Sequence, residues 1–420
     1  MIDRTVAAGV DAAMMLRWVV LAASLAALLA PGSGACAYDV VLSTQGEFID
    51  AYLVNGQPFP PRVVFDDPDP PAPDDPASPP PRVGRHLNGK VCFFPHHTGH
   101  SGQFLVADDT YREACLDRAT PQARCSATAR RSRLYVGTDP DGWGVFRKNG
   151  RWTRQHIHTS WNYPTDPQPQ GTIDPQGCAF DAAGRLFGTD VGSGSFGNPN
   201  GSLLVFFPGP HKRYDTYCFL DKALGAPSMP AMDAAGNLYV PETASGRVNK
   251  FGPPFPSSEA DCPNAAHLVT TPPTKTAYLT AATSGLATPS GIVQVPGTDH
   301  FYVGSVLIPD LINEYDANGI LVRNIVPAGV PKNPIGMDVG SDGTLYYAEL
   351  NLDPVTFNTR CGSVSMVRFD GSGNPLAPET LGIHLRFPDG ITVVDSKRLK
   401  VNLLKLPPSP DIDPSRCGGE

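Results

Sequence analysis

Short runs of alternating apolar and polar residues recur along the chain, and turns rich in Gly, Asp and Asn separate them. Residues 181–190 (DAAGRLFGTD) and 233–242 (DAAGNLYVPE) have nearly the same sequence, and residues 340–349 (GSDGTLYYAE) are a third copy. Each copy predicts a tight turn followed by a β-strand. The repetition predicts a fold that is built from equivalent β units.

Each unit begins with a Pro-x-Gly triplet and continues through four short strands. The triplets start alternating strands at Pro175, Pro289, Pro334 and Pro388. Third and fourth strands around a polar turn follow in residues 312–325 and 363–376. Four antiparallel strands per repeat of about 40–60 residues are typical of a β-propeller blade.

Six second strands can be counted from one apolar position in each repeat. These positions are Leu134, Leu186, Leu238, Phe301, Leu345 and Leu399. An additional copy at residues 102–109 leaves a seven-bladed propeller as the alternative, although it lies too close to Leu134 for a complete blade. The sequence therefore predicts an all-β, six-bladed propeller.

The last repeat lacks two strands before the C-terminus, and the N-terminal part of the chain is expected to supply them. Residues 39–53 have the pattern of a third and a fourth strand. Pairing the two ends in one blade would close the ring and remove an exposed sheet edge. The expected organisation is a signal peptide (1–37), closing strands (38–56), a linker rich in Pro and Asp (57–82), the propeller (83–404) and a tail (405–420).

Composition and targeting signals narrow the class of protein further. The 33 Lys and Arg residues against 41 Asp and Glu residues give a net charge of −8, which excludes the basic footprint of a nucleic-acid-binding protein. The apolar run at residues 18–30 precedes Ala-Cys-Ala, as in a secretory signal peptide. It is shorter than the roughly 20 residues that span a membrane. We expect a secreted or periplasmic protein without a membrane span; lipid attachment at Cys36 is the alternative.

Eight cysteines remain after removal of the signal peptide, and an exported chain is expected to oxidise them to disulfides. Cys115 and Cys125, which flank a short polar loop, are the first expected pair.

The residues just before the first strand of each blade are expected to point into the central mouth, where residues of all blades converge. Oxygen-bearing side chains at these positions could hold a hard cation such as Ca²⁺ or another divalent cation. The expected ligands are Asp389, Gln176 and Asn88. The alternative is that Pro-x-Gly only forms the turn into each strand. The full set of positions is Asn88, Gln176, Ser228 or Met229, Ser290, Ile335 and Asp389.

Other residues with acid–base chemistry occur outside this ring. His96 and His100 lie in a short histidine cluster after the first inner strand and are the candidate catalytic residues. His156 and His158 would share one strand face. Solvated loop histidines are the alternative in both cases. Acidic residues that end second strands are expected to bind loop backbone, namely Asp108, Asp139, Asp190, Glu242 and Glu349.

The repeats PSGIVQVPGTDHFYVGS, PIGMDVGSDGTLYYAEL and PDGITVVDSKRLKV resemble the superfamily of senescence marker protein, gluconolactonase and paraoxonase, with its strictosidine-synthase-like and NHL-type relatives. The resemblance covers roughly residues 175–402. It implies a six-bladed propeller with an axial calcium ion that Glu, Asn and Asp side chains hold. Asp389 matches the family's Asp turn, whereas Gln176, Ser290 and Ile335 replace its Asn residues.

The resemblance also implies a function. We expect a propeller that binds a small polar molecule or lactone at its mouth, with cation-dependent lactonase or esterase activity as the associated chemistry. The alternative is a non-catalytic, NHL-like propeller that binds a protein or glycan partner.

Overall fold

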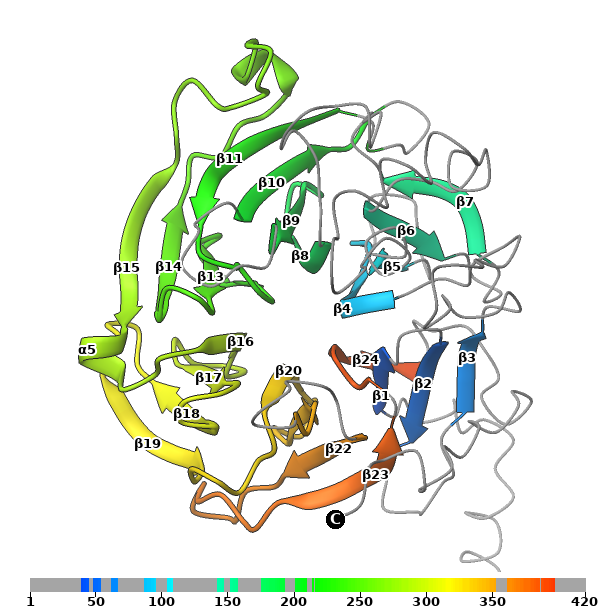
Figure 1. Cartoon of the computed structure of the whole chain (residues 1–420), viewed down its shortest axis with the longest axis vertical. Helices are drawn as coiled ribbons and strands as arrows, with labels where there is room; N and C mark the ends of the chain where they lie inside the picture. The colour runs from blue at the N-terminus through cyan, green and yellow to red at the C-terminus, as the bar shows by residue number, and fades with distance from the viewer. Residues whose placement is uncertain are drawn as a thin grey trace, which may run out of the picture. The chain divides into compact units, whose positions relative to one another are not determined.

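The described strands form six four-stranded antiparallel sheets around a common axis (Figure 1). This confirms the expectation of an all-β propeller. The computed structural model describes residues 39–44, 48–53, 62–66, 87–95, 104–108, 142–146, 152–157, 175–192, 201–209, 214, 216–352, 361–385 and 387–396. All of them belong to one unit of the chain, Asp39–Glu420.

The first three sheets come from the N-terminal half of the ring. The first contains β4 (Leu87–Phe93), β5 (Phe104–Asp108), β6 (Gly142–Phe146) and β7 (Trp152–Ile157). The second contains β8 (Pro175–Phe180), β9 (Leu186–Asp190), β10 (Gly201–Phe207) and β11 (Thr216–Leu224). The third contains β12 (Ala231–Met232), β13 (Leu238–Glu242), β14 (Arg247–Gly252) and β15 (Thr274–Thr280).

The remaining three sheets complete the ring. The fourth contains β16 (Pro289–Gln294), β17 (Phe301–Ser305), β18 (Leu311–Tyr315) and β19 (Leu321–Val326). The fifth contains β20 (Pro334–Val339), β21 (Leu345–Glu349), β22 (Gly362–Val367) and β23 (Glu379–Leu385). The sixth contains β24 (Ile391–Asp395), β1 (Asp39–Thr44), β2 (Phe48–Leu53) and β3 (Arg62–Asp66). Two short helical turns, η3 (Glu259–Asp261) and α5 (Ala281–Ser284), lie in the third sheet's connections.

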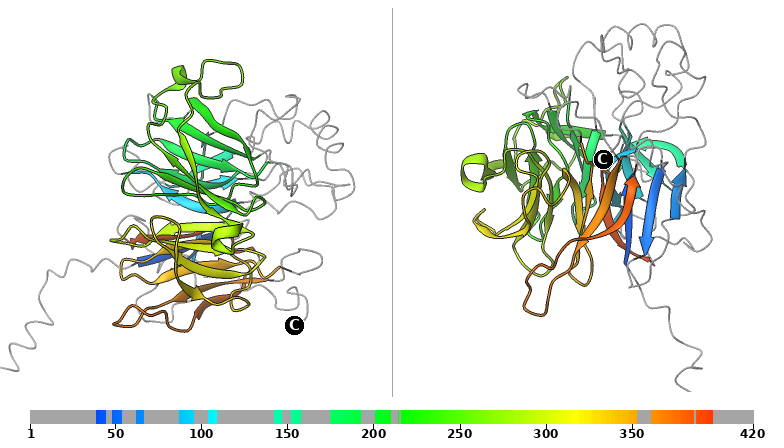
Figure 2. Two further views of the ribbon diagram at one scale, coloured as in Figure 1. Left: turned by 90° about the vertical axis from the view of Figure 1, so that its left-hand side faces the viewer. Right: turned by 60° about the horizontal axis from the view of Figure 1, so that its bottom comes forward.

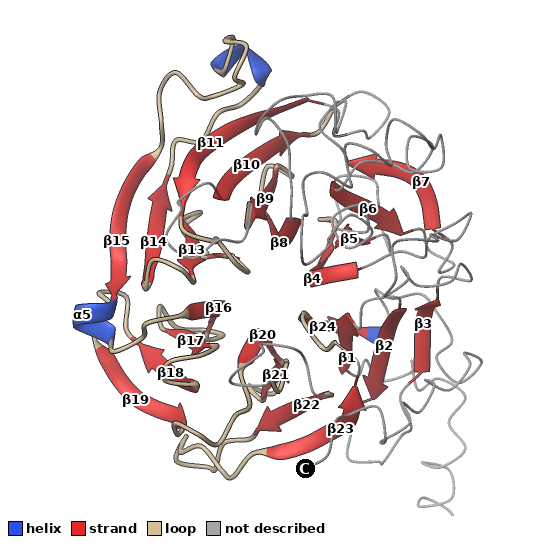
Figure 3. Ribbon diagram, in the orientation of Figure 1, coloured by secondary structure: helices blue, strands red, loops and turns tan. Residues whose placement is uncertain are grey.

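The hydrophobic core lies between neighbouring sheets. The strands β9, β13, β17 and β21 are buried along their whole length, because another sheet packs against each of their faces. Aromatic rings fill the spaces between sheets, as where Tyr239 and Phe301 approach to 4.3 Å between centroids. The outer strands β15 and β19 are largely exposed at their starts. Figure 3 shows the outer strands at the perimeter and the inner strands around the centre.

Both ends of the described chain contribute to the sixth sheet. The strand β1 pairs antiparallel with β24, from Asp39 opposite Asp395 to Ser43 opposite Ile391, and with β2 on its other side. Val40, Val41 and Leu42 have no exposed surface, so burial accompanies this pairing. Figure 1 shows β24 beside β1, and Figure 2 gives two further views of the ring to which they belong.

The strand order differs from the sequence interpretation in two details. The strands Asp39–Thr44 and Phe48–Leu53 are the second and third strands of the sixth sheet, and Arg62–Asp66, which falls within the expected linker, is its fourth strand. In the first sheet β5 pairs directly with β4, so the supposed additional copy at residues 102–109 contains that sheet's second strand. Leu134 and Leu399 lie outside the described residues.

The glycine of each Pro-x-Gly triplet lies where two inner strands nearly touch. A Cβ atom at Gly390 would lie 1.8 Å from the carbonyl oxygen of Gly89. The same atom at Gly336 would lie 2.3 Å from the carbonyl oxygen of Asp389. Any side chain would therefore collide with the next blade's backbone. The repeated triplet thus marks contacts between blades around the axis.

Hydroxyl groups bridge the blades beside these contacts. Thr44 Oγ1 donates to the carbonyl of Gly89 (2.9 Å) and accepts from the amide of Gly390 (2.8 Å). Thr189 Oγ1 makes the corresponding bridge between the second and third sheets by donating to Ser228 O (2.8 Å). These bonds satisfy backbone groups at the axis that no strand partner reaches.

Disulfides reinforce the same region and the periphery. Cys92 and Cys178 join β4 to β8, and Cys218 and Cys262 join β11 to the segment after η3. Cys361 is also disulfide-bonded. The expected Cys115–Cys125 pair lies outside the described residues. These bonds are consistent with an extracellular protein. Within the part of the chain that the structure describes, no helix has the length and apolar character needed to cross a membrane.

Replacing Thr44 by Val should lower the free energy of unfolding by about 1–3 kcal/mol, because the buried amide of Gly390 and carbonyl of Gly89 both lose their partner. Urea unfolding measures this change. Thr276→Val, at an exposed position of β15, is the matched control and should stay within about 0.5 kcal/mol of the wild type. An unchanged midpoint for Thr44→Val would contradict the bridging role.

Removing the disulfide between the first two sheets, with Cys92→Ala and Cys178→Ala together, should cost about 2–4 kcal/mol. The disulfide closes a segment of 86 residues, so its loss frees the unfolded chain considerably. Chemical unfolding of the double variant against the oxidised wild type tests this. Equal stability of the two proteins would show that the disulfide does not hold the sheets together.

Candidate functional site

The candidate site consists of the residues at or just before the start of each inner strand. We call these residues the axial ring. Among its described side chains, Gln176 is half-buried, whereas Ser228, Ser290, Ile335 and Asp389 are buried. The backbone of Asn88 lies in β4, but its side chain is outside the described residues, as are His96 and His100.

The axial ring is continuous in the structure. Gly89 lies against the backbone of Gln176, and Gly177 lies against the carbonyl of Ser228. The amide of Met229 donates to Ser290 O at 3.2 Å. The structure therefore brings the sequence-predicted positions of neighbouring blades together.

Asp389 has no exposed surface and ties the sixth sheet to the first. Its carboxylate oxygen Oδ2 accepts a hydrogen bond from the amide of Gly89. Its own amide donates to the carbonyl of Thr44 at 3.2 Å. The family-matched residue is thus part of the joint where the ring closes, which sequence reasoning did not foresee.

The described donors of the axial ring do not fit the calcium site that the resemblance implies. Calcium takes six to eight oxygen ligands, usually with several carboxylates. Here Asp389 is the one described carboxylate at a ring position, Ile335 is apolar, and Ser290 Oγ donates to Pro334 O at 2.9 Å. Among the described residues no group of three or more His, Cys, Asp or Glu side chains is arranged to hold a metal ion.

Ser228 differs from the other ring residues in its hydrogen bonding. Its side chain is 2% exposed, and its Oγ has no hydrogen-bond partner among the described residues. Burial of a hydroxyl group without a partner costs about 1–3 kcal/mol in proteins. Its carbonyl, in contrast, accepts from Thr189. Ser228 Oγ is therefore a buried hydroxyl at a ring position that lacks a hydrogen-bond partner among the described residues.

Acidic residues at the ends of second strands hold loops in place, as expected from the sequence. Asp190 Oδ1 accepts from the amide of Gly192 (2.9 Å), which belongs to its own loop. Glu242 and Glu349 reach farther, to the amides of Gly225 (2.7 Å) and Lys332 (2.9 Å). Those two amides lie in the loops that lead into inner strands, so the acids position the surroundings of the axial ring. The side chains of Asp108 and Asp139 lie outside the described residues.

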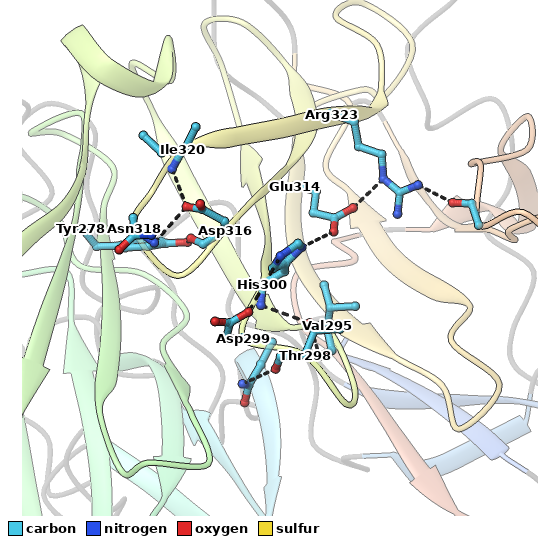
Figure 4. A network of polar contacts seen from close by, with 12 residues as sticks. Tyr278, Val295, Thr298, Asp299, His300, Glu314, Asp316, Asn318, Ile320 and Arg323 are labelled. Atoms are coloured by element: carbon cyan, nitrogen blue, oxygen red, sulfur yellow. Dashed lines mark hydrogen bonds and ion pairs between the residues drawn. The ribbon is translucent and has the colours of Figure 1, made fainter.

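A second charged network lies away from the ring (Figure 4). Glu314 is buried, and its carboxylate lies 2.7 Å from His300 Nδ1 and 2.6 Å from Arg323 Nε. Arg323 also donates to the carbonyl of Gly373 in the fifth sheet. Burial and the charge of Glu314 raise the pKa of Tyr302 to about 12. Because the network joins two blades with all its charges paired, we assign it a structural role.

No protein-family model and no curated protein matches the sequence. Several solved structures are similar in fold. A chain of the nidogen/laminin complex aligns at 12% identity with a TM-score of 0.49, over 84% of this chain and 98% of that one. Virginiamycin B lyase from Staphylococcus aureus aligns at 12% identity with a TM-score of 0.43, over 82% of this chain and 81% of that one.

A structural-genomics protein assigned as a gluconolactonase aligns at 12% identity with a TM-score of 0.41, over 74% of this chain and 89% of that one. At these identities and TM-scores the similarity carries no conclusion about activity.

Replacing Asp389 by Ala should lower the free energy of unfolding by about 1–3 kcal/mol, because the buried amide of Gly89 loses its acceptor. Asp389→Asn keeps an acceptor oxygen and should retain most of this stability. Asp299→Ala, at a side chain that is 77% exposed, is the control and should be close to neutral. Thermal and urea unfolding measure all three variants.

The opposite result is also informative. If Asp389→Ala keeps the wild-type stability but loses a stabilisation by added Ca²⁺, the structural assignment is wrong and the residue is a metal ligand.

Proposed function

We propose that the protein binds a small, neutral polar molecule at the axial ring. The observation that carries this proposal is the buried hydroxyl of Ser228, whose Oγ has no partner among the described residues. Buried polar groups in native proteins almost always find a partner. A ligand hydroxyl or carbonyl group would supply that partner.

The neighbours of Ser228 support a neutral ligand. Gln176 and Ser290 occupy the ring positions on either side of it, and both side chains are uncharged. An amide donates and accepts hydrogen bonds, and so does a hydroxyl. This donor set suits hydroxyl, carbonyl or lactone groups better than it suits a charged group.

Hydrolysis of a lactone or ester would extend this binding function. Ser228 would donate a hydrogen bond to the carbonyl oxygen of such a ligand. The catalytic candidates His96 and His100 lie outside the described residues, and the described ring does not fit calcium, so we derive no catalytic step through either. We further propose that the protein acts outside the cytoplasm, in keeping with the signal peptide expected from residues 1–37 and with the disulfides.

Ligand-observed NMR with D-glucose and δ-valerolactone as probes tests the proposal on the full-length protein. At least one probe should bind to the wild-type protein. Ser228→Ala should raise the Kd of that probe about five- to tenfold, as expected for the loss of one neutral hydrogen bond. Ser372→Ala, at an exposed turn of the fifth sheet, is the matched control and should leave the Kd unchanged.

Two further outcomes bear on the class of function. Turnover of δ-valerolactone that requires added CaCl₂ would extend the proposal to a cation-dependent hydrolase, whereas binding without turnover would favour the non-catalytic propeller. Failure of both probes to bind, or binding that Ser228→Ala leaves unchanged, would contradict the proposed site.

A further inference from the structure

Two loops beside the axial ring expose apolar side chains. Ile308, in the loop that follows β17, is 68% exposed, and Val330, in the loop that precedes β20, is 48% exposed. Ser305 at the end of β17 pairs with Pro289 at the start of β16. Both loops therefore lie at the end of the propeller where the inner strands begin.

Hydrogen bonds hold the first loop beside the axial ring and the second loop against the first. Thr288 Oγ1 accepts from the amides of Leu307 (2.8 Å) and Ile308 (3.0 Å), only two residues before Ser290. The amide of Gly329, next to Val330, donates to the carbonyl of Asp310 (3.1 Å). Both apolar side chains are thus presented by loops with fixed backbones.

An apolar cluster connects the loop after β17 to the ring itself. Met229, Val306 and Ile335 are buried in one cluster, and Leu307 and Leu352 pack against it while remaining partly exposed. Met229 and Ile335 belong to the starts of inner strands, whereas Leu307 precedes the exposed Ile308. Apolar packing therefore connects the ring to the loop that carries Ile308, next to the ring positions of Ser228 and Ser290.

We propose that the ligand of the axial ring is amphiphilic and that Ile308 and Val330 select for its apolar part. This inference rests on the proposed function, since it needs the polar end of the ligand to bind at Ser228. Small-molecule sites commonly combine a few polar groups with apolar lining. An alkyl or aryl group that covers Ile308 and Val330 would remove both partners' apolar surface from water and so strengthen binding.

Methyl, butyl and hexyl β-D-glucopyranoside are suitable probes, because they share one polar head and differ only in the alkyl chain. Isothermal titration calorimetry with the full-length protein should show at least a tenfold gain in affinity from the methyl to the hexyl compound. The double variant Ile308→Ser, Val330→Ser should lose most of this gain while binding the methyl compound as the wild type does.

Two control variants separate this inference from the proposed function. Ile320→Ser removes an equally apolar side chain, 64% exposed, from the turn before β19 and should leave the whole series unchanged. Ser228→Ala should raise the Kd of all three compounds by the same factor, so that the dependence of affinity on chain length is retained. Thermal unfolding checks that each variant remains folded.

The outcomes are distinct. Binding that depends on Ser228 but does not strengthen with chain length, or that strengthens equally in the double variant, overturns the amphiphilic ligand and leaves the site intact. No binding by any of the three compounds, or binding that is indifferent to Ser228→Ala, overturns the site and this inference together.

Discussion

The close approach of the inner strands at the axis is the constraint on which the rest of this structure depends. Backbone of the next blade occupies the place where Gly336 and Gly390 would carry a Cβ atom. Larger residues would push the blades apart and open the packed layers between them, where side chains such as Tyr239 and Phe301 meet. The repeated Pro-x-Gly triplet thus reflects close packing between blades as well as turns within them.

The same close approach gives the side chains of the axial ring different roles. Where two backbones approach this closely, their amides and carbonyls need partners from elsewhere, and side chains of the ring or of second strands provide them. Asp389 and Ser290 serve in this way, as does Thr44. The carbonyl of Ser228 accepts from Thr189, whereas its Oγ has no partner among the described residues. Whether a ring side chain can bind a ligand therefore depends on whether the backbone groups between its two blades need that side chain as a hydrogen-bond partner.

Sequence reasoning succeeded where a turn and a strand are defined by neighbouring residues. The copies at 181–190 and 233–242 place β9 and β13 correctly, because an Asp-x-x-Gly turn and the apolar alternation act over a few positions. It failed where the partner is remote. Nothing near Asp389 in the sequence indicates that its carboxylate accepts a hydrogen bond from Gly89. The strand β3 was missed because it lies in a segment rich in proline, which predicts a linker. The ring positions were predictable, but the hydrogen-bond partners of their side chains were not.

The pairing of β1 with β24 also orders events during synthesis. The partner of the first described strand lies in the last one, so β1 has its edge exposed until residues 391–395 leave the ribosome. The sixth sheet can therefore be completed only after residues 391–395 have been made, although β1 is made long before them. Any interruption of synthesis before Ile391 leaves a chain whose strand β1 has no neighbour on that side.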